Sequence, residues 1–226
     1  MTDLDKKALG GLARFVVCLA LLLFLPAWTL DYWQAWLFLA VFSTSMLATT
    51  LHLMRNDPKL LERRMNAGPA AEQDKRQKII QTAATVAFVA VIVVSVVDHR
   101  FAWSGGVSPH VAVAGDALVA LGLLIVFLVF KENTFASASI EVDADQKVVS
   151  TGPYAVVRHP MYAGALIMVT GIPPALGSWW GLLAALAMTL AIVWRLLEEE
   201  RFLAENLLGY QEYRSKVPQR LLPLIW

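Results

Sequence analysis

The chain has 226 residues, of which 58% are hydrophobic and only 16% are charged. This apolar content is too high for an ordinary soluble domain, and the charged residues cluster between long apolar runs, so we expect an integral membrane protein. The formal net charge is +1, and membrane topology accounts for the basic residues, which argues against nucleic acid as a partner.

Four apolar runs in the first part of the chain are long enough to cross a bilayer. They cover about residues 11–30, 33–54, 79–97 and 111–130. We therefore expect residues 1–130 to form an N-terminal membrane bundle of four spans.

A further apolar stretch, residues 161–197, has nearly the length of two spans. Its middle holds residues that favour a turn, namely Gly171, Pro173, Pro174 and Gly177. This pattern predicts a helical hairpin, with one span ending near Leu176 and the next beginning near Ser178. The chain as a whole is then an all-α, polytopic membrane protein of about six transmembrane helices. Residues 131–226 form a cytosol-facing loop, the hairpin and a tail, integrated with the bundle in one domain.

The distribution of lysine and arginine predicts the orientation of the spans. Of the 19 basic residues, 18 lie in the first residues, in segments 55–78 and 131–160, or in the tail from Arg195, and only Arg100 lies elsewhere. Basic residues accumulate on the cytoplasmic side of membrane proteins. We expect a protein of the cytoplasmic membrane of a prokaryote, with its active site facing the cytosol.

The chain offers little for a disulfide or a metal centre. Its single cysteine, Cys18, lies within the first apolar run, and its four histidines are scattered along the sequence. The sequence has no P-loop, no C-x-x-C and no H-E-x-x-H motif. We therefore expect no metal cofactor.

The segment GPYAVVRHPMYAG, residues 152–164, lies where a polar loop meets an apolar helix. Within it, Pro160 suits the first position of a helix, where its missing N–H costs nothing. The free amide groups of such a helix start attract anions, and Arg158 adds a positive charge beside it. The segment therefore indicates an anion-accepting site on the cytoplasmic side.

The last span returns to the same membrane surface with a second set of polar residues. Arg195 and Glu199 are four residues apart and share a helix face. Together with the helix start at Pro160, they suggest a pocket for a zwitterionic or cationic cofactor beside a lipid-phase substrate. The same residue types are also typical of simple membrane anchors, with Tyr154 and Tyr162 as interfacial aromatics, so the residues alone leave both interpretations open.

The block from about Lys147 to the C-terminus resembles the isoprenylcysteine carboxyl methyltransferase family and its phospholipid methyltransferase relatives. The resemblance rests first on the run VVSTGPYAVVRHPMYAG and on a downstream pattern R-x-x-x-E-E-x-x-L. That pattern and the tail comprise Arg195, Glu199, Glu200, Leu203, Tyr210, Tyr213, Val217 and Pro218. The resemblance covers roughly the last 80 residues of the chain.

The resemblance implies methyl transfer from S-adenosylmethionine, which enters from the cytosol and leaves as S-adenosylhomocysteine. The implied cofactor-binding residues are Gln146, Lys147, Val148, Val149, Tyr154, His159, Pro160, Met161, Tyr162, Glu199 and Glu200. Arg195 matches the family arginine that faces the acceptor, and Arg158 and His159 are further candidates for a catalytic role. Counting from Arg195 selects Glu199 as the cofactor carboxylate, whereas counting back from the tail tyrosines selects Glu198.

The acceptor stays open at this stage. A lipophilic molecule that enters from the membrane suits the short chain, and it would be a carboxylic acid or prenylated cysteine, a phospholipid or other amine, or a small thiol. Membrane lipids are the expected surroundings and partners. A non-enzymatic alternative is a carrier for a small solute, although its charged residues are expected at helix ends and not at the midplane.

Overall fold

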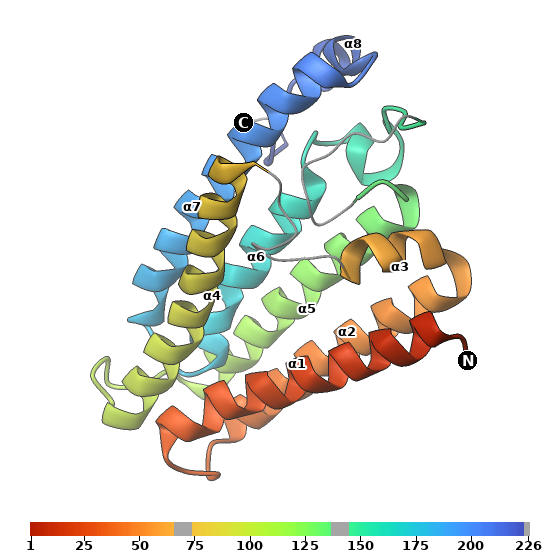
Figure 1. The fold of residues 1–226 in the computed structure, drawn as a ribbon. Helices are drawn as coiled ribbons and strands as arrows, with labels where there is room; N and C mark the ends of the chain where they lie inside the picture. The colour runs from red at the N-terminus through yellow and green to blue at the C-terminus, as the bar shows by residue number, and fades with distance from the viewer. Residues whose placement is uncertain (66–73, 137–144, 224–226) are drawn as a thin grey trace.

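The computed structural model describes residues 1–65, 74–136 and 145–223, and these residues are organised as helices (Figure 1). In chain order the elements are α1 (Asp3–Ala27), α2 (Trp33–Asn56), α3 (Pro58–Met65), α4 (Lys75–Phe101), α5 (Pro109–Glu132), the 3₁₀ helix η1 (Gly152–Ala155), α6 (Pro160–Ala175), α7 (Gly181–Asn206) and α8 (Tyr210–Lys216). The all-α class expected from the sequence is confirmed.

Five of the described helices are long and apolar enough to cross a membrane: α1, α2, α4, α5 and α7. The protein is therefore a polytopic integral membrane protein. Helix α6, the first arm of the expected hairpin, has 16 residues and is not among these five. At 1.5 Å per residue it is about 24 Å long, which is shorter than the hydrocarbon core of about 30 Å.

The turn residues of the apolar hairpin set the length of α6. Pro160 begins the helix at its first position, and Pro173 and Pro174 occupy its last turn. Gly177 then adopts a left-handed φ of 76°, which a glycine tolerates without steric cost. The predicted position of the hairpin turn is confirmed, and α7 resumes at Gly181.

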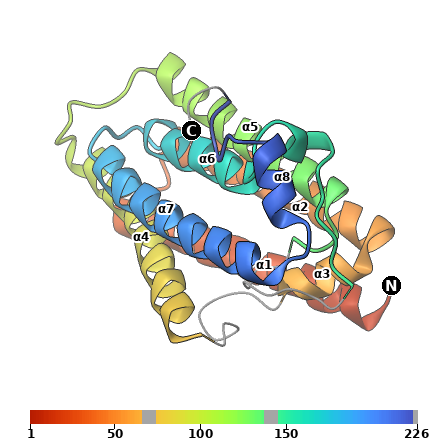
Figure 2. The ribbon, with the colours of Figure 1, turned by 90° about the horizontal axis from the view of Figure 1, so that it is seen from above.

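Glycines bring the backbones of α5 and α6 into direct contact, and Figure 2 shows α6 lying between α5 and α7. Gly115 and Gly122 lie seven residues apart on α5, and Gly164 and Gly171 repeat this spacing on α6. A β-carbon on Gly164 would lie 2.7 Å from the carbonyl oxygen of Gly122, and one on Gly171 would lie 2.7 Å from that of Gly115. Such small-residue faces permit close helix packing inside a membrane.

A buried carboxylate fixes the end of the bundle where α4 ends and α7 begins, which the distribution of basic residues predicts to be the outer end. Asp98 of α4 is fully buried and accepts hydrogen bonds from the Ser178 hydroxyl at 2.5 Å and from the Ser104 hydroxyl at 2.7 Å. It also accepts a bond from the backbone N–H of Trp180 at 3.3 Å, at the start of α7. Exposed tryptophans surround this end, as in the aromatic belt of a membrane interface: Trp28, Trp33, Trp36, Trp103, Trp179 and Trp180.

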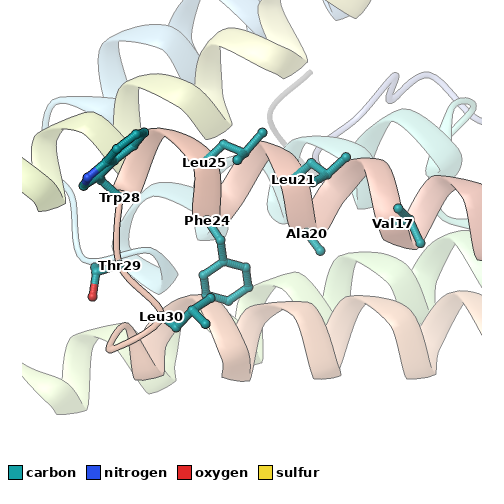
Figure 3. Close-up of a pocket in the computed structure, with 8 residues that line it drawn as sticks. All are labelled: Val17, Ala20, Leu21, Phe24, Leu25, Trp28, Thr29 and Leu30. Atoms are coloured by element: carbon teal, nitrogen blue, oxygen red, sulfur yellow. The ribbon is translucent and has the colours of Figure 1, made fainter.

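An apolar groove runs along the outer half of α1 and has a volume of about 530 Å³ (Figure 3). Its walls are formed by Val17, Ala20, Leu21, Phe24, Leu25, Trp28, Thr29 and Leu30. These side chains suit contact with lipid. The polar segments that the sequence analysis singled out lie at the other end of the helices, where α3, η1, the start of α6 and α8 gather (Figure 1).

The glycine contacts between α5 and α6 make a direct prediction about stability. In Gly122→Ala the new methyl group would lie 2.6 Å from the backbone nitrogen of Met168, and we expect a loss of about 1–3 kcal/mol from overpacking. Gly10→Ala is the matched control, because a β-carbon on Gly10 meets no atom within 4 Å and alanine is the better helix former. Thermal unfolding in detergent checks the pair, and equal midpoints for both variants would contradict the contact.

Candidate functional site

Two hydrophobic clusters build the inner end of the bundle. The first packs Leu60 and Leu61 of α3 against Phe130 of α5, with Met161 and Tyr154 against it. The second gathers α8 and the end of α7 and contains Val148, Tyr154, Leu203, Ala204, Leu207, Tyr210, Tyr213 and Val217. Tyr154 belongs to both clusters, so it joins the loop before α6 to both sides of the site.

Glu200 is the buried centre of an ionic network at this end. Its side chain is only 4% exposed, and it accepts a hydrogen bond from Arg158 Nε at 2.8 Å and another from Arg220 Nε at 2.6 Å. Arg158 Nη2 also lies 2.6 Å from the same carboxylate, and Arg214 Nε lies 3.9 Å from it. The carboxylate therefore connects α7, the segment before α6 and the C-terminal tail.

The C-terminal tail is attached to the start of α6 through the backbone. The N–H of Arg158 donates to the carbonyl of Gln219, and the N–H of His159 donates to that of Arg220, both at 2.9 Å. Arg158 Nη1 additionally donates to the carbonyl oxygens of Val217 at 2.9 Å and Pro218 at 2.6 Å. These contacts assign Arg158 the task of holding the tail, and its expected catalytic role stays a prediction.

Tyr162, Glu199 and Arg195 meet on the other face of the same helix pair. The Tyr162 hydroxyl is buried and donates a hydrogen bond to Glu199 Oε2. Arg195 is also buried, and its guanidinium hydrogen-bonds to the Tyr162 hydroxyl. Arg195 and Glu199 thus both contact Tyr162 of α6, which agrees with the prediction that they share a helix face.

The structure also distinguishes the three consecutive glutamates of α7. Glu198 pairs with Arg201 at 3.1 Å, and the arginine of this pair is largely exposed. Glu200 binds the arginines of the buried network, and Glu199 contacts Tyr162. Of the two carboxylates that the sequence left as alternatives, Glu199 is the one that contacts Tyr162.

Tyr154 is held in place from two directions. Asn133 Nδ2 donates to its hydroxyl at 2.9 Å, and the Tyr213 hydroxyl donates to its backbone carbonyl at 2.7 Å. The pKa of Tyr154 is raised to about 12, mainly by burial. Glu199 also raises this pKa, whereas the hydrogen bond with Asn133 lowers it. Tyr154 therefore stays a neutral phenol next to the Glu199 carboxylate.

His159 is a neutral, buried imidazole. Its side chain is 5% exposed, and Nε2 lies 4.0 Å from Glu200 Oε1 with no hydrogen-bond partner among the described residues. The pKa of His159 is lowered to about 4, mainly by burial. Arg158 and Arg220 also lower this pKa, whereas Glu200 opposes the change. At neutral pH the ring carries no charge, and it can donate one hydrogen bond and accept another.

The segment before η1, residues 146–149, lies against α8 through Val148. Val148 packs in the cluster around Tyr210, and its Cγ2 atom lies 3.9 Å from where a β-carbon on Gly209 would be. The neighbouring Gln146 and Val149 are partly buried, and Lys147 is exposed. Of the remaining sequence-predicted cofactor residues, Pro160 begins α6 and Met161 packs against the α3 cluster.

Arg64 on α3 packs at this end of the bundle, and the sequence analysis did not single it out. Its guanidinium lies over the Phe130 ring, 4.8 Å from the centroid. Burial lowers the pKa of Arg64, Tyr162 raises it and Arg195 lowers it. The signal in the sequence was the short amphipathic run PKLLERRM, which topology alone explained as a basic cytoplasmic segment.

The donor and acceptor groups of this end fit S-adenosylmethionine. Glu199 supplies a carboxylate that suits an ammonium group or ribose hydroxyls. The buried Tyr210 hydroxyl and His159 Nε2 have no hydrogen-bond partner among the described residues, so each has unused bonding capacity next to the network. Apolar side chains such as Met161 and Val148 offer contacts for an adenine ring or a methylene chain.

The buried network around Glu200 predicts a large loss of stability when its charge is removed. In Glu200→Gln, Arg158 and Arg220 lose a shared buried counter-charge, and we expect a cost of about 3–5 kcal/mol. Glu198→Gln is the matched control, because its ion pair with exposed Arg201 contributes about 1 kcal/mol at most. Thermal unfolding in detergent measures both, and a Glu200→Gln midpoint equal to that of Glu198→Gln would refute the network's role.

The comparisons with known proteins concern the same part of the chain. Residues 111–208 match the family model described as phospholipid methyltransferase. A curated relative, the cobalt-zinc-cadmium resistance protein CzcN of Cupriavidus metallidurans, is 29% identical over 103 residues, which are 45% of this chain and 47% of the relative. The alignment thus spans about half the length of each protein. The matched region of the family model runs from the start of α5 to the end of α7 and contains Tyr162, Arg195 and Glu199.

Proposed function

We propose that the protein is a membrane methyltransferase that uses S-adenosylmethionine and methylates a lipophilic acceptor arriving from the bilayer. The observation that carries this proposal is the meeting of Tyr162, Glu199 and Arg195 within the region that matches the phospholipid methyltransferase family. The concentration of basic residues at this end supports a site that faces the cytosol.

The chemistry suits the residues that meet there. S-adenosylmethionine, when bound, supplies a methyl group on a sulfonium, which already carries a good leaving group. The protein then has to orient the reactants and exclude water, and both tasks suit a site built from buried tyrosines and arginines. Glu199, oriented by Tyr162, would bind the cofactor, and Arg195 would bind the acceptor on the membrane side.

The acceptor class determines whether a base is required. A carboxylate acceptor, as in a prenylated cysteine, needs no base at neutral pH. An amine acceptor, as in a phospholipid, must lose a proton, and His159 or a glutamate would accept it. The lowered pKa of His159 makes its ring a weak base, which favours a glutamate for this task. The family description favours a phospholipid, so N-methylation of a lipid amine is the first acceptor reaction to test, with O-methylation of a lipid acid and S-methylation of a small thiol next.

Binding of S-adenosylhomocysteine to the purified protein in detergent tests the proposal. We expect saturable binding that Glu199→Gln weakens at least about tenfold, because a hydrogen bond to a charged group contributes about 1.5–3 kcal/mol. Arg195→Gln should change this affinity less and should mainly impair methyl transfer to a lipid extract. Glu198→Gln is the control, because its carboxylate pairs with Arg201.

Two outcomes would count against this function. A well-folded preparation without saturable S-adenosylhomocysteine binding would remove the methyltransferase proposal and favour a solute carrier, whose flux in liposomes needs no cofactor. Equal affinities for Glu199→Gln and Glu198→Gln would show that the cofactor is held elsewhere.

A further inference from the structure

The end of α5 is attached to the loop before α6 at two consecutive residues. Glu132, the last residue of the helix, accepts a hydrogen bond from the Thr151 hydroxyl. Asn133, the next residue, donates from Nδ2 to the Tyr154 hydroxyl at 2.9 Å. These bonds connect positions 19 and 21 residues apart in the sequence, and together they fix η1 against the end of α5.

The turn after α5 holds Asn133 in one orientation. Its backbone N–H donates to the carbonyl of Val129 at 2.9 Å, and its carbonyl accepts from the N–H of Ala136 at 3.2 Å. Its side-chain Oδ1 accepts from the backbone N–H of Phe135 at 2.9 Å. An amide oxygen only accepts and an amide nitrogen only donates, so the Phe135 bond leaves Nδ2, the donor, to face Tyr154.

This orientation determines what the Tyr154 hydroxyl can do. A phenol hydroxyl accepts through its oxygen and donates its single proton, and the bond with Asn133 uses only the oxygen. Within residues 1–65, 74–136 and 145–223, that proton has no acceptor. Because the pKa of Tyr154 is raised to about 12, mainly by burial, the hydroxyl keeps its proton at neutral pH. The hydroxyl is therefore a donor with one hydrogen bond still to make.

The Tyr154 side chain is held firmly enough for that bond to have a fixed direction. It packs against the cluster that contains Phe130 and also against the cluster that contains Tyr210. The Tyr213 hydroxyl donates to its backbone carbonyl at 2.7 Å. A donor held in this way loses little freedom when a ligand binds, so more of its hydrogen bond contributes to affinity.

We propose that Asn133 is a positioning residue that directs the proton of the Tyr154 hydroxyl toward a hydrogen-bond acceptor of bound S-adenosylmethionine. The proposal rests on the methyltransferase function proposed above and deepens it, because it explains how one predicted cofactor residue is prepared for its ligand. If position 133 accepted a hydrogen bond from Tyr154, the proton would be used within the protein. Asn133 itself contacts no cofactor atom and acts only through Tyr154.

A double-mutant cycle tests the proposal through binding of S-adenosylhomocysteine to the full chain in detergent at about pH 8, where carboxyl groups are ionised. Asn133→Asp keeps the shape of the side chain and the oxygen that accepts from Phe135, but its second oxygen can only accept. The Tyr154 proton then turns to the new carboxylate, and we expect the affinity to fall about three- to tenfold, as for the loss of one hydrogen bond. Tyr154→Phe should cause a similar loss. In the Tyr154→Phe background, Asn133→Asp should change the affinity by less than twofold.

Two further variants separate the direction of the hydrogen bond from charge and from folding. Asn56→Asp adds the same charge to an exposed asparagine at the end of α2, and it should leave the affinity unchanged within twofold. Asn133→Ser removes the amide donor without adding a charge. It should weaken binding in the wild type but not in the Tyr154→Phe background, and it provides the cycle if Asn133→Asp does not fold. Thermal unfolding in detergent identifies the variants that fold.

Several results would overturn the inference. An unchanged affinity in Tyr154→Phe or in folded Asn133→Asp would show that this hydrogen bond does not prepare the site. An equal loss from Asn133→Asp with and without the Tyr154 hydroxyl would assign the effect to charge or structure. In both cases, a wild type that binds S-adenosylhomocysteine would preserve the proposed function. A wild type that binds none would refute the proposed function itself, and this inference with it.

Discussion

The arrangement of the inner end depends on one buried carboxylate. Glu200 is almost completely removed from solvent, and burying a charge is costly unless its partners are close and well oriented. Arg158 and Arg220 meet this requirement from two other segments of the chain. Because the ion pairs tolerate little displacement, they fix the start of α6 and the C-terminal tail relative to α7.

The helical geometry of α7 turns this constraint into a site. Consecutive residues of an α-helix point about 100° apart, so adjacent glutamates cannot share a partner surface. Glu200 points to the arginine network, Glu199 to Tyr162, and Glu198 to the exposed Arg201. One stretch of acidic sequence therefore contacts three different partners, and cofactor binding by Glu199 stays a proposal. The glycine contacts then hold α5 and α6 together, and Arg64 of α3 lies over Phe130 near the end of α5.

Much of the architecture was predictable from local sequence features. Hydropathy located the long helices, and Pro173, Pro174 and Gly177 located the hairpin turn. The positions of long apolar helices and of turns depend on residues that are neighbours in the sequence, so the sequence reveals them. The same turn residues bound α6, which runs from Pro160 to Ala175 and is shorter than the helices that meet the usual length for crossing a bilayer.

The contacts of the site were less predictable because they are tertiary. Residue spacing placed Arg195 and Glu199 on one face, but it could not show that Arg158 binds Glu200 and the tail carbonyls 59 and 60 residues away. Arg64 escaped notice because the positive-inside rule already accounts for a basic loop. The cofactor residues predicted from the sequence, including Lys147 and Val149, stay predictions, as does the catalytic role of His159.

The central claim is that Glu199 and Tyr162 form the cofactor side of a site at the inner end of α6 and α7. A structure of the protein in nanodiscs with saturating S-adenosylhomocysteine tests it most directly. The account predicts ligand density beside Glu199 and Tyr162, with the Glu200 network intact. Ligand density elsewhere in the bundle, away from Glu199 and Tyr162, would contradict it.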